Sequence, residues 1–353
     1  MTATVTDAKI NLLESLLGSS SRISVVTHTR PDGDAVGSSS AMMHWLLAHG
    51  KDARLLLPNA CPDNISFVIG ETCAGKVLRQ DTEPEAVARW IAGSDLVIAL
   101  DLSGFDRAEG MQEALLASSA RKILIDHHLN PQEQDFDLVF SETDISSASE
   151  LLFWIMTAMR EAAGDAAKLP MPELRALLTG MTTDTNNFAN SVFPSTFEMA
   201  SLMLGAGVDR DGVINEIYNR SRENRLRMIG HVLKDNLCIL PSGAAYIVVR
   251  ASETDLYDIR DGEMEGIVNM PLTIDEVRLS IFLREDNGFF RVSVRSKRGT
   301  SAFRLAGRYF HGGGHEQASG GRLFFPGDIA DPSMAEAYIE RVTDEFFSSD
   351  NEA

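Results

Sequence analysis

Apolar residues in the first half of the chain form short runs separated by longer amphipathic stretches. Four runs have the length and the valine, isoleucine and leucine content of strands buried on both faces: 22–28, 53–58, 95–100 and 122–127. Four amphipathic stretches predict helices: 36–50, which Gly50 ends, 84–92, 107–118 and 147–163. This alternation predicts an N-terminal α/β domain with a parallel sheet over residues 1–194.

The pattern changes twice in the second half of the chain. Strand-like runs disappear over 195–237, which predicts a helical connector, and its arginine-rich stretch is typical of a solvated helix face. Strand patterns then return at 244–250, 277–285 and 289–297, the last two joined by "EDNG" in a predicted hairpin. With a helix expected at 333–347, residues 238–353 predict a smaller C-terminal α/β domain with a mixed sheet.

Composition narrows the class of protein. The chain has 353 residues, 44% of them apolar and 24% charged, which indicates a soluble globular protein. It contains no apolar run of roughly 18 to 20 residues that would span a membrane and no basic start followed by an apolar core, so we expect a cytoplasmic protein. Its three scattered cysteines predict ordinary thiols. The net charge of −19 argues against binding to long nucleic acid, but it allows a small anion to be held through a metal ion.

Acids and histidines follow the predicted strands. His28, Asp32 and Asp34 come after the first strand, and Asp101 and His127 close two others. A further aspartate, Asp184, follows a helical stretch. Because carboxyl ends of parallel strands meet at one edge of a sheet, these groups should converge there. Each alone reads as a helix cap or turn residue. Together, two imidazoles and four carboxylates predict a site for a manganese or magnesium pair better than for structural zinc.

The motifs around these residues resemble a known family. "HTRPDGDAVGS", "DLSGFDR", "IDHH" and "TDTNNF" are similar to the four ordered motifs of the DHH phosphoesterase superfamily, and "GGGHEQASGG" (312–321) resembles the signature of its DHH-associated domain. The chain looks most like the bifunctional nanoRNases, which degrade very short oligonucleotides and remove the 3'-phosphate of adenosine 3',5'-bisphosphate (pAp). It departs from the family at Glu316, where proline is common, and at Asn186, where TDTG is frequent. Both departures concern substrate preference.

The resemblance implies roles for individual residues. One metal ion would be held by His28, Asp32 and Asp101, and the other by Asp34, Asp101, His127 and Asp184. The ions would be Mn2+, with Mg2+ or Co2+ as alternatives. Asp126 would orient an imidazole, and His128 would face the substrate phosphate as a catalytic group. The alternative for His128 is a hydrogen-bonded histidine at a strand end.

The C-terminal domain is expected to bind substrate. Its candidate residues are Arg295, Ser296, Asn269, Gly312, Gly313, Gly314 and His315. A guanidinium binds phosphate through two parallel hydrogen bonds, and glycine lets backbone amides approach it closely. A glycine-rich turn alone is more often a loop, and Asn269 is nearly as compatible with a turn.

These observations predict a two-domain metal-dependent phosphoesterase that acts on short oligonucleotides and nucleotide phosphates in a cleft between the domains. A cyclic or linear dinucleotide phosphodiesterase is the alternative within the superfamily. A pyrophosphatase is disfavoured because so small an anion has little use for base-contacting groups. A nucleotide sensor without turnover is disfavoured because all six metal-binding residues are present. The sequence leaves a homodimer open.

Overall fold

The computed structural model describes residues 4–260, 262–314 and 316–350, and the chain forms two compact units, Met1–Arg220 and Ser221–Ala353. The predicted connector, 195–237, contributes to both units. Its first helices, α8 (Pro194–Gly205) and α9 (Arg210–Tyr218), belong to the first unit, and α10 (Glu223–His231) belongs to the second.

The first unit is built on a parallel sheet of six strands in the order β3-β2-β1-β4-β5-β6. The strands are β1 (Arg22–Val26), β2 (Asp52–Leu57), β3 (Val77–Arg79), β4 (Leu96–Leu100), β5 (Arg121–Asp126) and β6 (Leu138–Ser141). The predicted α/β class and parallel sheet are therefore confirmed. The two edge strands, β3 and β6, were not predicted because they are short and only partly buried.

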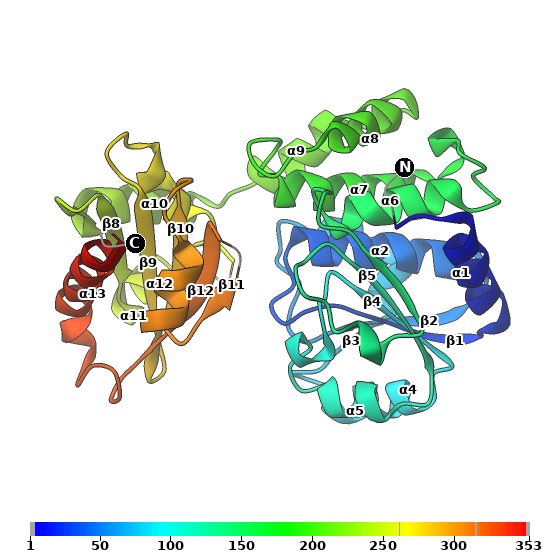
Figure 1. The fold of residues 1–353 in the computed structure, drawn as a ribbon, viewed down its shortest axis with the longest axis horizontal. Coiled ribbons are helices and arrows are strands. Elements are labelled where there is room, and N and C mark those ends of the chain that lie inside the picture. The colour runs from blue at the N-terminus through cyan, green and yellow to red at the C-terminus, as the bar shows by residue number, and fades with distance from the viewer. Residues whose placement is uncertain (1–3, 261, 315, 351–353) are drawn as a thin grey trace. The chain divides into compact units, whose positions relative to one another are not determined.

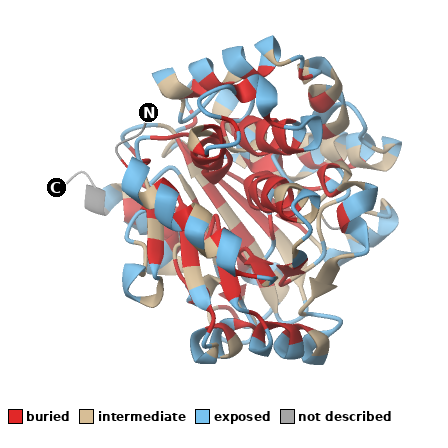
Figure 2. Cartoon of the chain, turned by 90° about the vertical axis from the view of Figure 1, so that its right-hand side faces the viewer, coloured by how far each residue is buried: buried red, intermediate tan, exposed pale blue. Residues whose placement is uncertain are grey.

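Helices cover both faces of this sheet (Figure 1). They are α1 (Asp7–Ser19), α2 (Gly33–Ala48), α3 (Gly70–Ala74), α4 (Pro84–Ala92), α5 (Gln112–Ala117), α6 (Ala148–Ala158) and α7 (Met171–Asp184). Helices α1, α2, α6 and α7 share one apolar core with the sheet, and α4 and α5 share the other. Successive strand residues alternate between the cores, so that Val25 joins the first and Val26 the second. The strands are accordingly buried on both sides (Figure 2).

The strand order reverses in the middle of the sheet. Strand β1 pairs with β2 on one side and with β4 on the other. The later strands are added outward from β1 in both directions. In doubly wound sheets of this kind, ligands bind outside the carboxyl ends of the strands at the reversal. This topology directs attention to the residues that follow β1 and β4.

The second unit contains a mixed sheet in the order β11-β12-β10-β9-β8-β7. Its strands are β7 (Leu237–Ile239), β8 (Ala244–Val249), β9 (Leu279–Asp286), β10 (Phe289–Ser296), β11 (Gly313–Gly314) and β12 (Ala318–Phe324). Strands β8 and β9 pair in parallel, and β9 and β10 form the predicted hairpin. Helices α12 (Ala302–Tyr309) and α13 (Ala335–Asp350) lie on one face and α10 on the other, and α11 (Ala251–Leu256) follows β8. The mixed sheet is also confirmed.

Two predicted helices in the first unit are too long. Helix α6 ends at Ala158 because Met159 adopts an extended backbone, and α5 begins only at Gln112, after a short 3-10 helix. Among the described residues, no helix combines the length and the apolar character needed to cross a lipid bilayer.

Candidate metal centre

Three of the predicted site residues come from the carboxyl ends of neighbouring strands. His28 follows β1, Asp101 follows β4 and His127 follows β5. The Asp101 carboxylate lies between the two imidazoles: its Oδ2 is 3.3 Å from Nε2 of His28, and its Oδ1 is 3.5 Å from Nε2 of His127. Nδ1 of His28 is engaged by the carbonyl of Thr29, which leaves Nε2 to face the carboxylate. The centre of the site therefore lies where the strand order reverses.

Helix α2 supplies two more carboxylates from its first turn. Asp32 is the N-cap of this helix, and its Oδ1 accepts hydrogen bonds from the amides of Asp34 and Ala35, both at 3.1 Å. The same oxygen lies 3.8 Å from Nε2 of His28. The two interpretations of Asp32, a helix cap and a site residue, are thus compatible, because one carboxylate has several lone pairs.

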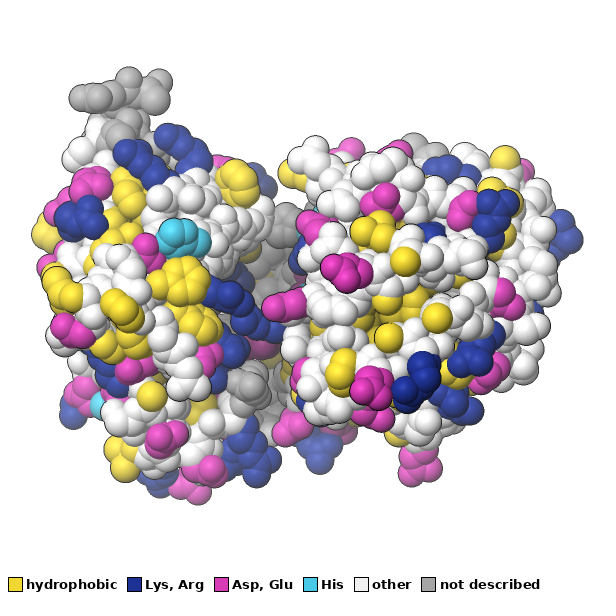
Figure 3. All heavy atoms as spheres, turned by 90° about the horizontal axis from the view of Figure 1, so that it is seen from below, with side chains coloured by type: hydrophobic (Ala, Val, Ile, Leu, Met, Phe, Trp, Pro, Cys, Tyr) yellow, Lys and Arg dark blue, Asp and Glu magenta, His cyan; other side chains and the backbone are white. Residues whose placement is uncertain are grey.

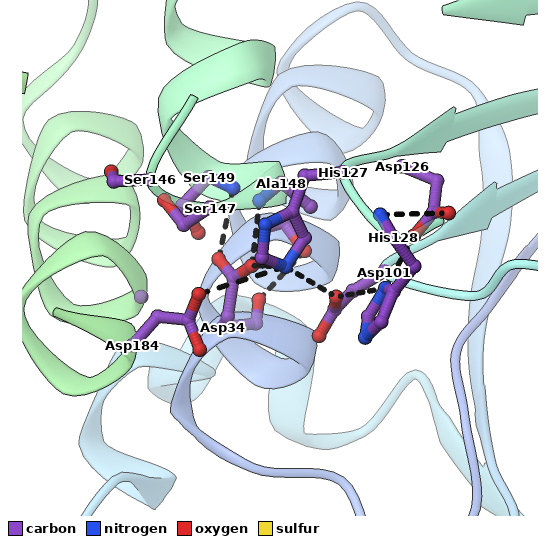
Figure 4. Close-up of polar contacts among 12 residues, drawn as sticks. Asp34, Asp101, Asp126, His127, His128, Ser146, Ser147, Ala148, Ser149 and Asp184 are labelled. Carbon is purple, nitrogen blue, oxygen red and sulfur yellow. Dashed lines mark hydrogen bonds and ion pairs between the residues drawn. The ribbon is translucent and has the colours of Figure 1, made fainter. Parts of the chain in front are cut away.

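Asp34 is fixed by a helix distant in sequence. Its buried carboxylate accepts hydrogen bonds from the amides of Ala148 and Ser149, at 2.6 and 2.9 Å, in the first turn of α6 (Figure 4). Sequence reasoning did not identify these two amides. The start of α6 was predicted at 147, and its N-cap is Ser147 in "SASE", whose hydroxyl accepts from the amide of Glu150. Nothing in the sequence indicates that these amides would face Asp34.

Close packing of α2 against α7 brings the last acid into the site. A Cβ at Gly33 would lie 2.1 Å from Oγ1 of Thr183, and one at Gly37 would lie 2.6 Å from a backbone oxygen of α7. Because the two helices approach this closely, Asp184 at the end of α7 places Oδ2 3.6 Å from Nε2 of His127. Glycine at these positions therefore serves the geometry of the site.

Gly180→Ala is expected to impair both the site and the fold. The new Cβ would lie 1.9 Å from Oγ of Ser149 and 2.8 Å from Oδ1 of Asp34, so the carboxylate must move. We expect kcat to fall roughly 10- to 100-fold and the free energy of unfolding to fall by about 1–3 kcal/mol. Gly205→Ala in α8, where a Cβ has open space, is the control. Steady-state kinetics and urea unfolding measure both, and wild-type kcat in Gly180→Ala would disprove the tight placement of Asp34.

The side chains form three overlapping clusters whose ligand atoms lie within 4.8 Å of one another: His28, Asp32 and Asp101; Asp34, His127 and Asp184; and Asp101, His127 and His128. All six residues predicted to bind metal are thus brought together. Oδ1 of Asp101 is buried without a hydrogen-bond partner among the described residues. A buried carboxylate oxygen between imidazoles and further carboxylates is what a divalent cation would complete, so the residues present fit a metal centre.

The clustered charges shift the pKa values of these groups. Burial would raise the pKa of Asp101, but the imidazoles of His127 and His28 outweigh it and hold that pKa well below its ordinary value. Burial would lower the pKa of His127, but Asp101 and the neighbouring carboxylates raise it to about 10. Burial, together with Asp32 and Asp101, raises the pKa of Asp184 to about 7 despite the nearby His127. The protein alone therefore retains protons that a metal ion would displace.

Asp126 and His128 form a pair at the edge of the cluster. Asp126, the last residue of β5, is fully buried, and its Oδ1 lies 2.8 Å from Nδ1 of His128 while its Oδ2 accepts from the His128 amide at 3.2 Å. The imidazole that Asp126 orients is thus that of His128, as Figure 4 shows. Nδ1 of His128 also lies 3.5 Å from Oδ1 of Asp101, so this histidine adjoins the cluster.

The second unit places Arg295 and Ser296 at the end of β10. The Arg295 guanidinium donates to the carbonyl of Val294 at 2.9 Å and to that of Ser319 at 3.3 Å, and burial lowers its pKa. The Ser296 hydroxyl donates to the carbonyl of Thr300 at 2.6 Å, which commits it to the turn that follows. Arg295 is half-buried and retains further donors for a ligand.

The predicted glycines lie on the same sheet as Arg295. Gly313 and Gly314 form β11, which pairs with β12, the neighbour of β10. A Cβ at Gly312 would lie 1.9 Å from the carbonyl oxygen of Gly320, so close packing of the backbone explains this glycine without a ligand. Asn269 is exposed in a 3-10 helix. His315 lies outside the described residues.

Fold and site together define an α/β protein with a candidate divalent-metal centre, and comparison with known families gives its class. Residues 22–181 match the N-terminal domain of the DHH family, and residues 244–331 match the DHHA1 domain. The chain therefore belongs to the DHH phosphoesterases, with a DHHA1 domain after the catalytic one. Five of the six residues predicted to bind metal fall inside the first match, and Asp184 lies three positions beyond its end.

Individual relatives differ in their assigned activities. The chain is 26% identical over 313 residues to the bifunctional oligoribonuclease and PAP phosphatase NrnA of Bacillus subtilis, covering 88% of this chain and 91% of that protein. It is 27% identical over 237 residues to the cyclic-di-AMP phosphodiesterase GdpP of the same organism, covering 64% of this chain but 35% of GdpP. A crystal structure of an exopolyphosphatase-related protein from Bacteroides fragilis is 32% identical, with a TM-score of 0.89 over 99% of this chain and all of that chain.

Proposed function

We propose that this DHH phosphoesterase is a manganese-dependent enzyme that hydrolyses very short oligonucleotides to mononucleotides and removes the 3'-phosphate of pAp. The observation that carries the catalytic part of the proposal is the position of Asp101, whose two oxygens each face a different imidazole. A carboxylate in this position could be a ligand of two metal ions, which would supply the charge for phosphate hydrolysis. The substrate part rests on the match to NrnA, which extends over nearly the whole length of both proteins.

In this proposal His28, Asp32 and Asp101 hold one ion, and Asp34, Asp101, His127 and Asp184 hold the other. Two bound divalent ions would supply a water of lowered pKa and positive charge for the nonbridging phosphate oxygens. The α6 amides keep the Asp34 carboxylate oriented, and Thr29 keeps Nε2 of His28 turned into the site.

His128 is the residue that we propose acts on the substrate phosphate. Its Nδ1 is engaged by buried Asp126, which fixes the ring and favours a proton on that nitrogen. The ring oriented in this way would stabilise negative charge on the phosphate or donate a proton to the departing ribose oxygen. Arg295 in the second unit is proposed to bind a terminal phosphate, assisted by Ser296, Asn269, the backbone of Gly312, Gly313 and Gly314, and His315.

A cyclic dinucleotide phosphodiesterase is the second candidate, because the chain also matches GdpP. That match covers about a third of GdpP, whereas the other match covers 91% of NrnA. We therefore favour linear substrates. The two proposals are separated by measuring initial rates with Mn2+ on pAp, the linear dinucleotide pApA, cyclic di-AMP, pyrophosphate and polyphosphate. Fastest turnover of cyclic di-AMP, or of polyphosphate alone, would reject the proposed function.

Binding of Mn2+ should release protons near pH 7. The imidazole of His127, with its pKa of about 10, must lose its proton to bind a metal ion. The carboxyl of Asp184, with a pKa of about 7, is partly protonated at pH 7 and must lose that fraction of a proton. Mn2+ affinity should consequently fall as the pH is lowered. The pKa values of His28 and Asp34 are also raised, so these ligands should add to the release. Titration calorimetry in two buffers of different ionisation enthalpy should therefore show at least about one proton released per protein. Binding without proton release would exclude His127 as a ligand.

Arg295→Ala should separate binding from chemistry. The residue lies in the second unit and is not among the clustered ligands, so we expect KM for pApA to rise roughly 10- to 100-fold with a smaller change in kcat. Hydrolysis of bis-p-nitrophenyl phosphate, which offers no terminal phosphate, should persist. Arg291→Ala is the matched control, because Arg291 lies on the same strand and is paired with Asp286. Equal losses on both substrates would place Arg295 in the fold or the catalytic site instead.

A further inference from the structure

The first unit contains a cavity of about 140 Å3 that the proposed reaction does not use. It lies at the ends of α2 and α7 remote from the metal centre. Helix α2 starts at the centre with Asp32 and Asp34 and ends at His49, while α7 starts with Glu173 in its first turn and ends at Asp184. His49 and Glu173 both line the cavity. Helix α2 has 16 residues, so the cavity lies about 24 Å from the metal centre along that helix.

The walls of this cavity combine an apolar lining with acids. Trp45, Met156, Met159 and Leu169 supply apolar surface, and the Trp45 ring stacks on that of His49 with centroids 3.9 Å apart. Two carboxylates, Glu161 and Glu173, also line it. An apolar enclosure with an aromatic face and acids is typical of sites for organic cations.

Glu173 is the acid of this cavity that has an unpaired oxygen within the described part of the chain. Its side chain belongs to a residue only 1% exposed, and its Oε2 has no hydrogen-bond partner among the described residues. Glu161, by contrast, pairs with His49 at 3.0 Å and is exposed. A buried carboxyl without a partner costs free energy, so a group that pairs with it would bind favourably.

We propose that this cavity binds a small primary ammonium ion with a short apolar chain, whose charged end pairs with Glu173 and whose chain packs on Met156, Met159 and Leu169. The size fits, since an engineered apolar cavity of about 150 Å3 accepts benzene. The other titratable groups that line the cavity are His49, Glu161 and Lys168, and Glu161 adds to the negative potential at Glu173. A cation relieves that repulsion, whereas a second anion would increase it.

Binding should be coupled to the loss of one proton. Burial and the nearby Glu161 raise the pKa of Glu173 to about 8, so below that pH its carboxyl is mostly protonated. The ammonium ion displaces this proton to the buffer, and a carboxylate–ammonium pair replaces the neutral acid. Affinity should therefore rise with pH and level off above about 8. Between about pH 8.5 and pH 6.5 it should weaken roughly 20-fold, in proportion to the ionised fraction of Glu173.

The probe is n-butylammonium, followed through the indole N–H resonance of Trp45 in the intact protein, with n-butanol as the neutral probe of the same shape. We expect saturable binding with a Kd on the order of 1 mM at about pH 8.5 and at least tenfold weaker binding of n-butanol. Glu173→Gln, which keeps the side-chain shape, should weaken n-butylammonium at least tenfold and abolish the pH dependence.

Several outcomes would overturn the proposal. Equal affinity for n-butanol and n-butylammonium in the wild type would show that charge plays no part, and this comparison needs no variant. Unchanged binding to folded Glu173→Gln would reject the assigned contact. Lys168→Met is the remaining test, because Lys168 also lines the cavity. If n-butylammonium binds only to Lys168→Met, the lysine itself occupies the site and no external cation is recognised.

Discussion

Asp101→Asn should lower kcat roughly 1000-fold or more on every substrate while the protein stays folded. Asparagine keeps the shape of the side chain but has one acceptor oxygen and no charge. It therefore cannot offer a negatively charged oxygen to both the His28 side and the His127 side of the site. Both proposed ion positions share Asp101, and loss of its carboxylate should therefore affect both. We expect chelation to mimic this loss in the wild type, with Mn2+ restoring activity.

A matched control lies at the other end of the same strand. Asp95 precedes β4 as Asp101 follows it, and its carboxylate accepts hydrogen bonds from the amides of Ser21 and Arg22 at 2.9 and 3.0 Å. Asp95→Asn keeps one of these two acceptor oxygens and loses the other hydrogen bond, but it lies at the opposite end of β4 from Asp101 and should keep near wild-type kcat. Circular dichroism and unfolding curves establish that both variants fold. Wild-type turnover in Asp101→Asn would remove the basis for a shared carboxylate.

Substrate length should have the second large effect. The chain carries 51 acidic and 32 basic residues, and on the face that Figure 3 shows, lysine and arginine side chains are interspersed with acids. Affinity for long RNA needs a continuous basic track that releases counterions at each phosphate. We therefore expect efficient hydrolysis of substrates of about two to five nucleotides and little added affinity for each further phosphate.

This expectation can be measured with 5'-labelled RNAs of about two, five and twenty-four nucleotides at moderate salt. The short RNAs should be cut one nucleotide at a time, from the 5' end as in the similar nanoRNases, and kcat/KM for the longest should be at least roughly tenfold lower. A matched DNA and RNA pair of the short length serves as control for sugar preference. Processive digestion of the longest RNA would instead identify a long-strand exonuclease.

The fold could be predicted because buried parallel strands have a strong signal. The run that became β4 is continuously apolar, and those that became β1 and β5 are mostly apolar beyond their first residues, where they are buried on both faces. Once these strands are parallel, residues that follow them must share one edge of the sheet. The convergence of His28, Asp101 and His127 thus follows from topology and does not need side-chain detail.

Other parts of the site depend on contacts between distant segments. The amides that hold Asp34 lie more than a hundred positions away, in the first turn of α6. The sequence also could not predict which imidazole Asp126 orients. His127 and His128 are adjacent, and the directions of their side chains depend on the backbone after the strand ends. The close approach of α2 and α7 at Gly37 and Gly180 likewise requires knowing that these helices are partners.

The central claim is that one cluster of aspartates and histidines holds two metal ions through Asp101. An anomalous diffraction map at the manganese absorption edge, from crystals grown with Mn2+, tests it most directly. We predict two peaks, one in contact with His28, Asp32 and Asp101, and the other in contact with Asp34, Asp101, His127 and Asp184. A single peak, or two peaks of which at most one touches Asp101, would contradict the account.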